Sequence, residues 1–354
     1  MGAADDIVFE VRGRLGLVTL NRPQALNAFT LDMYRRFDPV LRAWAADPAI
    51  AAVAVRGAGD RAFCAGGDIR AIYEAGRGLG PDPSLTASFF REEYRLIRRV
   101  HRYPKPYLAL IDGITMGGGA GVSLNGRYRV ATERTVLAMP ETGIGLFPDV
   151  GATHFLNRCP GRIGRYMGLS GARLRAADAL YCGLATHFVP RERLDALIAA
   201  LAAGEGGDVA AVLAGFGGDP GAAPVAARQA AIDRVFAADA VEAILAALAA
   251  ETGDDADWAR QTRAELAGKS PTSQKIFLRQ MILGHGFELE AALMLEYRMS
   301  QHVMAGLDFY EGVRALIIDR DQRPAWRPAT LAEVDAATVD AYFAPLGEGE
   351  LTFD

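Results

Sequence analysis

The chain has 354 residues, of which 51% are hydrophobic and 23% charged, and its formal net charge at pH 7 is −5. This composition is ordinary for a globular protein of one large or two smaller domains, and it lacks the basic footprint of a nucleic-acid-binding protein. No uninterrupted apolar stretch reaches the length that spans a membrane. We therefore expect neither a nucleic-acid partner nor a membrane-spanning segment.

The three cysteines, Cys64, Cys159 and Cys182, are widely spaced and form neither a disulfide framework nor a zinc-binding pattern. The five histidines are scattered, and none belongs to an H-E-x-x-H motif, so we expect no metal. The acidic start of the chain, residues 1–6, resembles neither a secretory signal nor an arginine-rich transit peptide. A chain without disulfides fits a reducing compartment, and we expect a cytoplasmic protein.

Short apolar runs and helical periodicity alternate along the first half of the chain, which is typical of β/α units. The first two runs flank Gly13 and predict a β-hairpin. The predicted strands are residues 7–11, 15–20, 51–55, 106–111, 128–131 and 136–139. The predicted helices follow Thr30 as an N-cap, begin near Asp68, span residues 84–102, and follow the three glycines 117–119.

Beyond about Gly161 the pattern becomes mainly helical. The predicted helices cover residues 191–202, 224–237, 240–251 and 255–268, and one more begins with Ser270 as N-cap and Pro271 at its first position. Residues 204–223 are rich in glycine and predict a loop or linker. Asp308 and Glu311 have the spacing of a capping box.

Two glycine-rich loops follow predicted strands and precede predicted helices. In residues 62–69, Gly66 and Gly67 stand just before a helix start, where backbone N–H groups are exposed; a tight turn before an Asp-capped helix is the plain alternative. Residues 117–119 are three consecutive glycines, which cost conformational entropy and indicate close approach to a ligand or close helix–sheet packing. Two such loops suggest a pair of N–H donors that converge on one oxygen, an oxyanion hole.

Residues 138–151 hold two carboxylates, Glu141 and Asp149, among apolar residues and glycines. A carboxylate in an apolar pocket has a raised pKa and can serve as a base or acid near neutral pH; alternatively both cap turns. Glu93 lies in a charged segment, residues 91–94, that reads by itself as a solvated helix face. No G-x-S-x-G elbow is present, so a serine nucleophile is poorly supported.

Together these segments resemble the enoyl-CoA hydratase/isomerase, or crotonase, superfamily. The resemblance rests on the order and spacing of residues 21–27 (NRPQALN), 62–69 (AFCAGGDI) and 117–119, and of Pro140-Glu141. It is closer still to the 3-hydroxyisobutyryl-CoA hydrolase branch. The segments that carry this closer resemblance, which covers almost the whole chain, are residues 63–69, 90–94, 113–119, 139–151, 270–273, 296–301 and 308–314.

The resemblance implies an α/β fold, a superhelix of ββα units with a mostly helical C-terminal part. Residues 1–200 would form the core with the acyl-CoA site, and residues 201–354 a helical region that packs on it. The N–H groups of Gly67 and Gly118 would form the oxyanion hole, and Glu141 would be the catalytic glutamate. Glu93 and Asp149 would contact the substrate, Asp149 also within the catalytic set. The CoA moiety would follow the backbone of Ala25, Leu26, Ala65, Gly66, Gly67, Asp68 and Ile69.

One position departs from the hydratase pattern. Hydratases of this superfamily carry a second catalytic glutamate two residues after the glycine triplet, where this chain has Gly121. The departure favours hydrolysis of a short 3-hydroxyacyl-CoA, such as 3-hydroxyisobutyryl-CoA in valine breakdown. Glu93 could partly replace the missing glutamate, which keeps an enoyl-CoA hydratase or isomerase as an alternative. A non-catalytic acyl-CoA-binding protein is the third reading, and Glu141 with both glycine loops argues against it.

The resemblance also bears on cofactors and partners. Acyl-CoA is the expected small-molecule partner, and because CoA is part of the substrate, no separate cofactor is expected. Members of the superfamily often assemble as trimers or larger rings, so a homo-oligomer is among the expectations, while the composition fixes no subunit number.

Overall fold

The structure is a computed structural model that describes residues 5–80, 82, 84–204 and 208–353. Two segments considered above fall partly outside these ranges: the N-terminal segment, of which residues 1–4 are not described, and the predicted linker, of which residues 205–207 are not described. The chain forms two compact units. The first unit comprises Met1–Gly67, Arg95–Leu137 and Leu174–Pro224, and the second unit Asp68–Tyr94, Ala138–Arg173 and Val225–Asp354. Because compact units and independently folding domains differ, the division near residue 200 stays a prediction.

The first unit is built on two sheets. The larger has six strands in the order β1 (Ile7–Arg12), β2 (Leu15–Leu20), β3 (Ala52–Gly57), β5 (Tyr107–Ile111), β7 (Tyr128–Ala131) and β9 (His187–Phe188). Only β1 and β2 pair antiparallel, as the predicted hairpin, and the remaining neighbours are parallel. The smaller sheet has the order β4 (Ala62–Cys64), β6 (Ile114–Met116) and β8 (Val136–Ala138).

Consecutive strands alternate between the two sheets. β3, β5 and β7 enter the larger sheet, and the strand that follows each of them, β4, β6 or β8, enters the smaller one. Every ββ pair therefore adds one position to both sheets, which is the superhelix of ββα units predicted from the sequence. The short strand β4 falls in a segment predicted as a loop, and no strand was predicted for β6, because three residues are too few for a clear periodic pattern.

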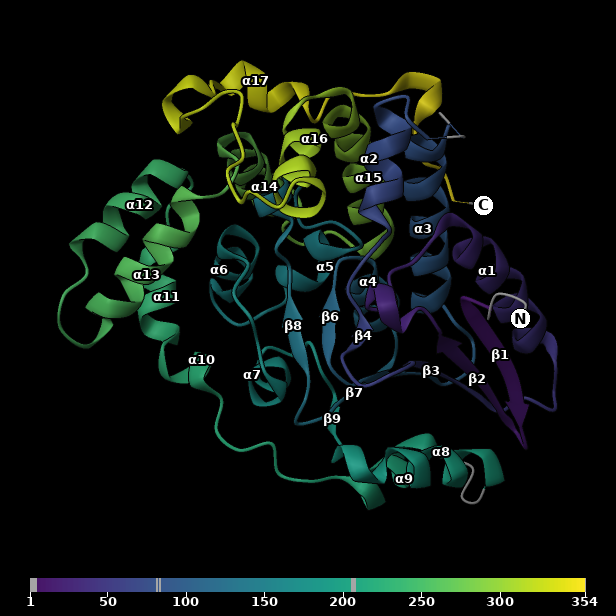
Figure 1. Ribbon diagram of the computed structural model, residues 1–354. Helices are drawn as coiled ribbons and strands as arrows, with labels where there is room; N and C mark the ends of the chain where they lie inside the picture. The colour runs from purple at the N-terminus through teal and green to yellow at the C-terminus, as the bar shows by residue number, and fades with distance from the viewer. Residues whose placement is uncertain (1–4, 81, 83, 205–207, 354) are drawn as a thin grey trace. The chain divides into compact units, whose positions relative to one another are not determined.

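Helices cover the larger sheet on one face. α8 (Leu194–Ala203) and α9 (Val209–Phe216) lie side by side (Figure 1) and share one apolar core with β2, β3, β5 and β7. In this core Leu197 and Leu213 are fully buried against strand residues such as Leu108. Helix α9 lies inside the stretch predicted as a linker, so that prediction is wrong for residues 209–216. The helix propensity of its three alanines and of Leu213 outweighs the effect of the glycines around them.

Other helices of the first unit position its loops. α1 (Leu31–Ala46) is capped as predicted, since Thr30 Oγ1 accepts a hydrogen bond from Met33 N at 3.2 Å. Its Trp44 packs so closely on β2 that a Cβ at Gly16 would lie 2.5 Å from the indole ring. α4 (Gly118–Leu124) is anchored to β5, because Tyr107 Oη donates to Val122 O at 3.0 Å. The remaining elements are η1 (Pro23–Ala25), α7 (Ala176–Tyr181) and η3 (Arg191–Arg193).

The second unit is mainly helical. Its elements are α2 (Ile69–Gly76), the first part of α3 (Leu85–His101), η2 (Glu141–Ile144), α5 (Ala152–Leu156), α6 (Ile163–Ser170), α10 (Pro224–Ala227, from Val225 on), α11 (Gln229–Val235), α12 (Val241–Ala250), η4 (Gly253–Asp255), α13 (Ala256–Ala267), α14 (Pro271–Leu283), α15 (Leu289–Ala305), α16 (Asp308–Val313), η5 (Arg314–Ile318), η6 (Leu331–Glu333), α17 (Ala336–Ala341) and η7 (Gly347–Gly349). Across the described ranges, no helix is both long and apolar enough to cross a membrane.

Two predicted helix starts in this unit have different outcomes. Ser270 caps α14 as predicted, because its Oγ accepts a hydrogen bond from Ser273 N at 3.0 Å. The capping box predicted at Asp308 and Glu311 is wrong. Asp308 instead accepts from the Ser270 hydroxyl at 2.6 Å and from Arg327 N at 2.9 Å, and Glu311 pairs with Arg314. The tertiary partners compete successfully with the local cap.

Candidate active site

The two glycine loops leave the same edge of the smaller sheet. β4 and β6 pair in parallel, with Ala62 opposite Ile114 and Cys64 opposite Thr115. Because parallel neighbours end at the same edge, the loop after Cys64 and the loop after Met116 emerge side by side. The topology therefore brings together two segments that are about fifty residues apart in the sequence.

Close contacts between the loops explain their glycines. Gly66 has φ +118°, and a Cβ placed there would lie 3.8 Å from the backbone nitrogen of Gly118. A Cβ at Gly119 would lie 2.2 Å from the carbonyl oxygen of Cys64, so no larger residue fits without a backbone shift. Gly118 is the first residue of α4, where the backbone N–H has no intrahelical acceptor. The predicted donor Gly118 thus lies next to the Gly66–Gly67 loop.

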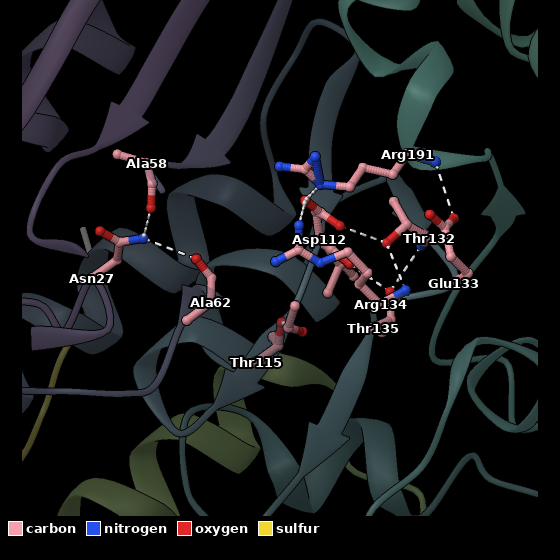
Figure 2. Close-up of polar contacts among 12 residues, drawn as sticks. Asn27, Ala58, Ala62, Asp112, Thr115, Thr132, Glu133, Arg134, Thr135 and Arg191 are labelled. Carbon is pink, nitrogen blue, oxygen red and sulfur yellow. Dashed lines mark hydrogen bonds and ion pairs between the residues drawn. The ribbon is translucent and has the colours of Figure 1, made fainter. Parts of the chain in front are cut away.

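The side chain of Asn27 stabilises the turn that leads into β4 and the first glycine loop. Its side-chain amide donates to Ala58 O and to Ala62 O, both at 2.9 Å, as Figure 2 shows. Figure 2 also shows a separate network at the end of β5, where the carboxylate of Asp112 accepts from the Thr132 hydroxyl at 2.7 Å and from Arg191 Nε at 2.9 Å. Both networks fix turns that follow the strands.

Within the first unit, backbone hydrogen bonds join the two segments that are predicted to bind CoA. Ala65 N donates to Leu26 O at 3.0 Å, and Phe29 N donates to Gly66 O at 2.9 Å. Ala25 closes η1 in the same segment. The other two predicted positions belong to the second unit, where Asp68 caps α2 and Ile69 begins it.

Three predicted carboxylates come together in the second unit. Glu93 lies on α3, Glu141 begins η2, and Asp149 follows in the loop before α5. Their exposed fractions are 2%, 5% and 3%, so the reading of Glu93 as part of a solvated helix face is wrong. Burial disfavours the charged form of each group, and three carboxylates in one place also repel one another.

Burial and a neighbouring carboxylate perturb the Glu141 carboxyl. Burial raises its pKa well above the ordinary value, and the charge of Asp149 raises it further, while Lys269 lowers it. Among the described residues, Glu141 Oε2 is buried without a hydrogen-bond partner. A Cβ at Gly143, in the same turn, would lie 3.2 Å from Lys269 Nζ, which places a cation beside the turn. An oxygen without a protein partner is available to water or substrate.

Tyr94 and Asp149 form a short hydrogen bond that the sequence did not predict. Tyr94 Oη donates to Asp149 Oδ2 at 2.6 Å, and both side chains are buried. Burial raises the pKa of Asp149 to about 7, although the Tyr94 hydroxyl stabilises its ionised form. Tyr94 stands in the segment that carried the family resemblance, but an isolated tyrosine gave no signal of this role.

A second unpredicted group braces the loop that carries Asp149. Glu296, on α15, accepts hydrogen bonds from Gly151 N at 2.7 Å, Thr153 N at 2.8 Å and the Thr153 hydroxyl at 2.7 Å. Gln280, on α14, donates to Pro148 O and to Thr153 Oγ1, both at 2.8 Å. The turn on both sides of Asp149 is therefore fixed by buried side chains from two helices. A glutamate within an otherwise apolar helix face was the available signal.

We expect the Asp149 carboxyl to make stability depend on pH. Its pKa is about 7 in the folded protein against 3.8 in the unfolded chain. The folded state therefore holds a proton over this range that the unfolded state has released, and the free energy of unfolding falls as the pH rises from 3.8 to about 7. Urea unfolding of the wild type and of Asp149→Asn measures the difference between their free energies of unfolding. This difference should narrow or reverse as the pH rises across this range. A difference that stays constant would contradict the raised pKa of Asp149.

The described part of the chain contains no group of three or more His, Cys, Asp or Glu side chains that could hold a metal ion. The three cysteines are free and buried. The groups described above are backbone donors in the first unit and buried carboxylates in the second.

Comparison with known proteins places the chain in a family. Residues 15–343 match the family model described as enoyl-CoA hydratase/isomerase. The 3-hydroxyisobutyryl-CoA hydrolase, mitochondrial, of Danio rerio is 47% identical over 99% of this chain and 92% of its own length, and that of Homo sapiens is 43% identical over the same shares. The names of both relatives place them in mitochondria, so the cytoplasmic location expected for this chain stays a prediction.

Two solved structures have the same fold as this chain, and their names give activities other than thioester hydrolysis. A carnitinyl-CoA dehydratase from Mycobacterium thermoresistibile is 41% identical with a TM-score of 0.92, over 99% of both chains. An enoyl-CoA hydratase from Rhodobacter sphaeroides is 39% identical with a TM-score of 0.89, over 99% of this chain and 100% of its own. The α/β superhelix is thus confirmed, and the chain belongs to the enoyl-CoA hydratase/isomerase family.

Proposed function

We propose that the chain hydrolyses a short 3-hydroxyacyl-CoA thioester, with 3-hydroxyisobutyryl-CoA, an intermediate of valine breakdown, as the first candidate. The observation that carries the proposal is the cluster of three buried carboxylates, Glu93, Glu141 and Asp149, in a family member that has no side chain at Gly121. Relatives at 43–47% identity bear the name of this hydrolase. Acyl-CoA is accordingly the proposed partner, and no cofactor beyond it is required.

The first unit would act on the carbonyl oxygen. In the proposed mechanism, the thioester oxygen accepts hydrogen bonds from Gly67 N–H and Gly118 N–H, and the CoA moiety follows the backbone of residues 25–26 and 65–69. Attack on the carbonyl carbon transfers negative charge to this oxygen. Each well-placed donor stabilises that charge by about 3 kcal/mol in the transition state. The contact between the two glycine loops supports this pairing.

The second unit would act on the carbonyl carbon. Glu141 either removes a proton from the attacking water or attacks directly to form an anhydride, which water then hydrolyses. Both routes require the ionised carboxylate, so the rate rises with pH as Glu141 loses its proton. The thiolate of CoA is the leaving group.

Glu93 and Asp149 would bind the 3-hydroxyl group or orient Glu141 and the water. A buried carboxylate that binds a hydroxyl discriminates strongly against a substrate without one, because its hydrogen-bonding capacity is then left unsatisfied. Purified protein should therefore release thiol from 3-hydroxyisobutyryl-CoA faster, in kcat/KM, than from isobutyryl-CoA by about 10²-fold or more. Equal rates would remove the hydroxyl-binding role, and no release from either thioester would contradict the hydrolase.

Hydration of an enoyl-CoA is the second candidate. It is favoured by the names of the two structural relatives, which are a dehydratase and a hydratase. Addition to a double bond requires an acid that delivers a proton to the α carbon. Gly121 is buried in α4 and offers none, so Glu93 would have to supply it. A cytoplasmic location and assembly into a homo-oligomer are further proposals, which rest on the lack of disulfides and on the family.

A further inference from the structure

A half-buried arginine, Arg91, lies on α3 two residues before Glu93 and belongs to none of the contacts described above. Its Nη2 atom donates to Tyr297 Oη and to Gly349 O, both at 2.8 Å. Its Nη1 atom donates to Glu350 O at 3.2 Å, and its guanidinium carbon lies 4.7 Å from the centroid of the Tyr297 ring. All three acceptors are neutral oxygens, so the planar group with its fixed donors serves to join α3 to two other segments.

The segment that supplies two of these acceptors, residues 346–351, is itself fixed within the second unit. Its Leu351 side chain is fully buried. Its Glu350 Oε1 atom accepts a hydrogen bond from Arg298 Nε on α15 at 2.9 Å. The segment and α15 are therefore held together independently of Arg91, and Arg91 attaches α3 to both of them.

Tyr297 connects Arg91 with the carboxylate cluster. The rings of Tyr297 and Tyr94 meet edge to face, with centroids 6.3 Å apart and planes at 80°, and both side chains are buried. Tyr94 Oη in turn donates to Asp149 Oδ2 at 2.6 Å. A hydrogen bond weakens when its length or angle changes, so the position of the Tyr94 ring governs the orientation of the Asp149 carboxylate. A chain of contacts thus runs from Arg91 through two buried tyrosines to Asp149.

We propose that Arg91 is a positioning residue, which holds Tyr94 against Asp149 and thereby sets the selectivity of the site for a 3-hydroxyacyl group. The inference deepens the proposed function and rests on it, since Asp149 is there assigned to the 3-hydroxyl group. Arg91 acts through Tyr297 and Tyr94 and is not itself a catalytic residue. Groups that bind a substrate have to be held within about 0.5 Å of their productive position, which is why a tie at this distance affects selectivity.

The test measures kcat/KM for 3-hydroxyisobutyryl-CoA and for isobutyryl-CoA and takes the ratio of the two. Arg91→Ala should lower this ratio about tenfold, because a displaced Asp149 carboxylate loses most of its hydrogen bond to the 3-hydroxyl group, whereas isobutyryl-CoA has no such group. Arg91→Lys keeps a cation but not the planar fork, so its ratio should lie between those of Arg91→Ala and the wild type. A loss of folded protein lowers both rates by the same factor, so an unchanged ratio in both variants overturns the positioning role.

Arg298→Ala is the matched control. Among the described residues, the side chain of Arg298 donates to Glu350 and to Phe343 O, and so it holds the same part of the chain without a hydrogen bond to α3. This variant should retain the wild-type ratio. Tyr94→Phe removes the hydrogen bond to Asp149, and in that background Arg91→Ala should have no further effect on the ratio, because both changes act through one contact. An equal fall in Arg298→Ala, or a full further fall in the double variant, overturns the assignment to Arg91.

Urea unfolding separates this inference from the proposed function, because it needs no turnover. If Arg91 holds Tyr94 in place, the shifts of the urea midpoint caused by Arg91→Ala and by Tyr94→Phe should be less than additive in the double variant. Less-than-additive shifts in a protein that hydrolyses no thioester would support the positioning role and overturn only the hydrolase. Hydrolysis with additive shifts and an unchanged ratio of kcat/KM would overturn only the role of Arg91.

Discussion

Glu141→Gln should lower kcat for thioester hydrolysis by about 10²–10⁴-fold, the usual contribution of a general base, or by more if Glu141 is the nucleophile. The amide keeps the volume of the side chain but has neither a basic nor a nucleophilic oxygen. The dissociation constant for the acyl-CoA should change little, because binding is assigned to the glycine loops and to other side chains. Single-turnover thiol release together with calorimetric binding measures both quantities.

Glu265→Gln is a suitable control for this result. Glu265 is an exposed glutamate of α13 in the same unit, and it acts on Lys269 electrostatically, as Glu141 does. The control should retain wild-type kcat. Because burial and Asp149 raise the pKa of Glu141, the wild-type rate should also rise with pH on an acid limb that the Gln variant lacks. Near-normal turnover by Glu141→Gln would remove Glu141 from the catalytic role.

Glu296→Ala should reduce the free energy of unfolding by about 3 kcal/mol or more, since it leaves several buried donors without an acceptor. Those donors are Gly151 N, Thr153 N and the Thr153 hydroxyl. Glu296→Gln keeps the volume and one acceptor oxygen, so its loss should be smaller. Urea unfolding at constant pH measures both variants against the wild type.

The same substitutions should separate stability from catalysis. Asp149 stands two residues before Gly151, so a loosened turn should lower kcat even where the Gln variant remains fully folded. Glu265→Gln, the exposed substitution on α13 in the same unit, serves as the control here too and should leave both quantities unchanged. If Glu296→Ala were as stable and active as the wild type, Glu296 would not position the Asp149 loop.

The sequence predicted the fold where local patterns are strong. The hairpin, the Thr30 and Ser270 caps and the long helix that carries Glu93 are all present, because alternation, capping chemistry and helical periodicity act within a few residues. β4 and β6 were missed, since strands of three residues are stabilised by pairing within the smaller sheet, which local sequence does not show. α9 was missed because glycines surround a short apolar helix.

The sequence predicted the candidate site residues themselves, but not the side chains that hold them in place. Glycine pairs before helices and carboxylates in an apolar segment are visible in the sequence, as Gly67 and Glu141 illustrate. The roles of Tyr94, Glu296 and Gln280 depend on contacts between residues more than fifty positions apart. Local sequence carries no information on such contacts, and only tertiary structure shows that these side chains brace the Asp149 turn.

The central claim, hydrolysis of a 3-hydroxyacyl-CoA, is tested most directly by offering 3-hydroxyisobutyryl-CoA and crotonyl-CoA separately to the purified protein. Free thiol and the enoyl absorbance are followed in each reaction. The account predicts rapid thiol release from 3-hydroxyisobutyryl-CoA and little change in crotonyl-CoA. Loss of the crotonyl double bond without thiol release from either substrate would contradict it and assign the buried carboxylates to hydration.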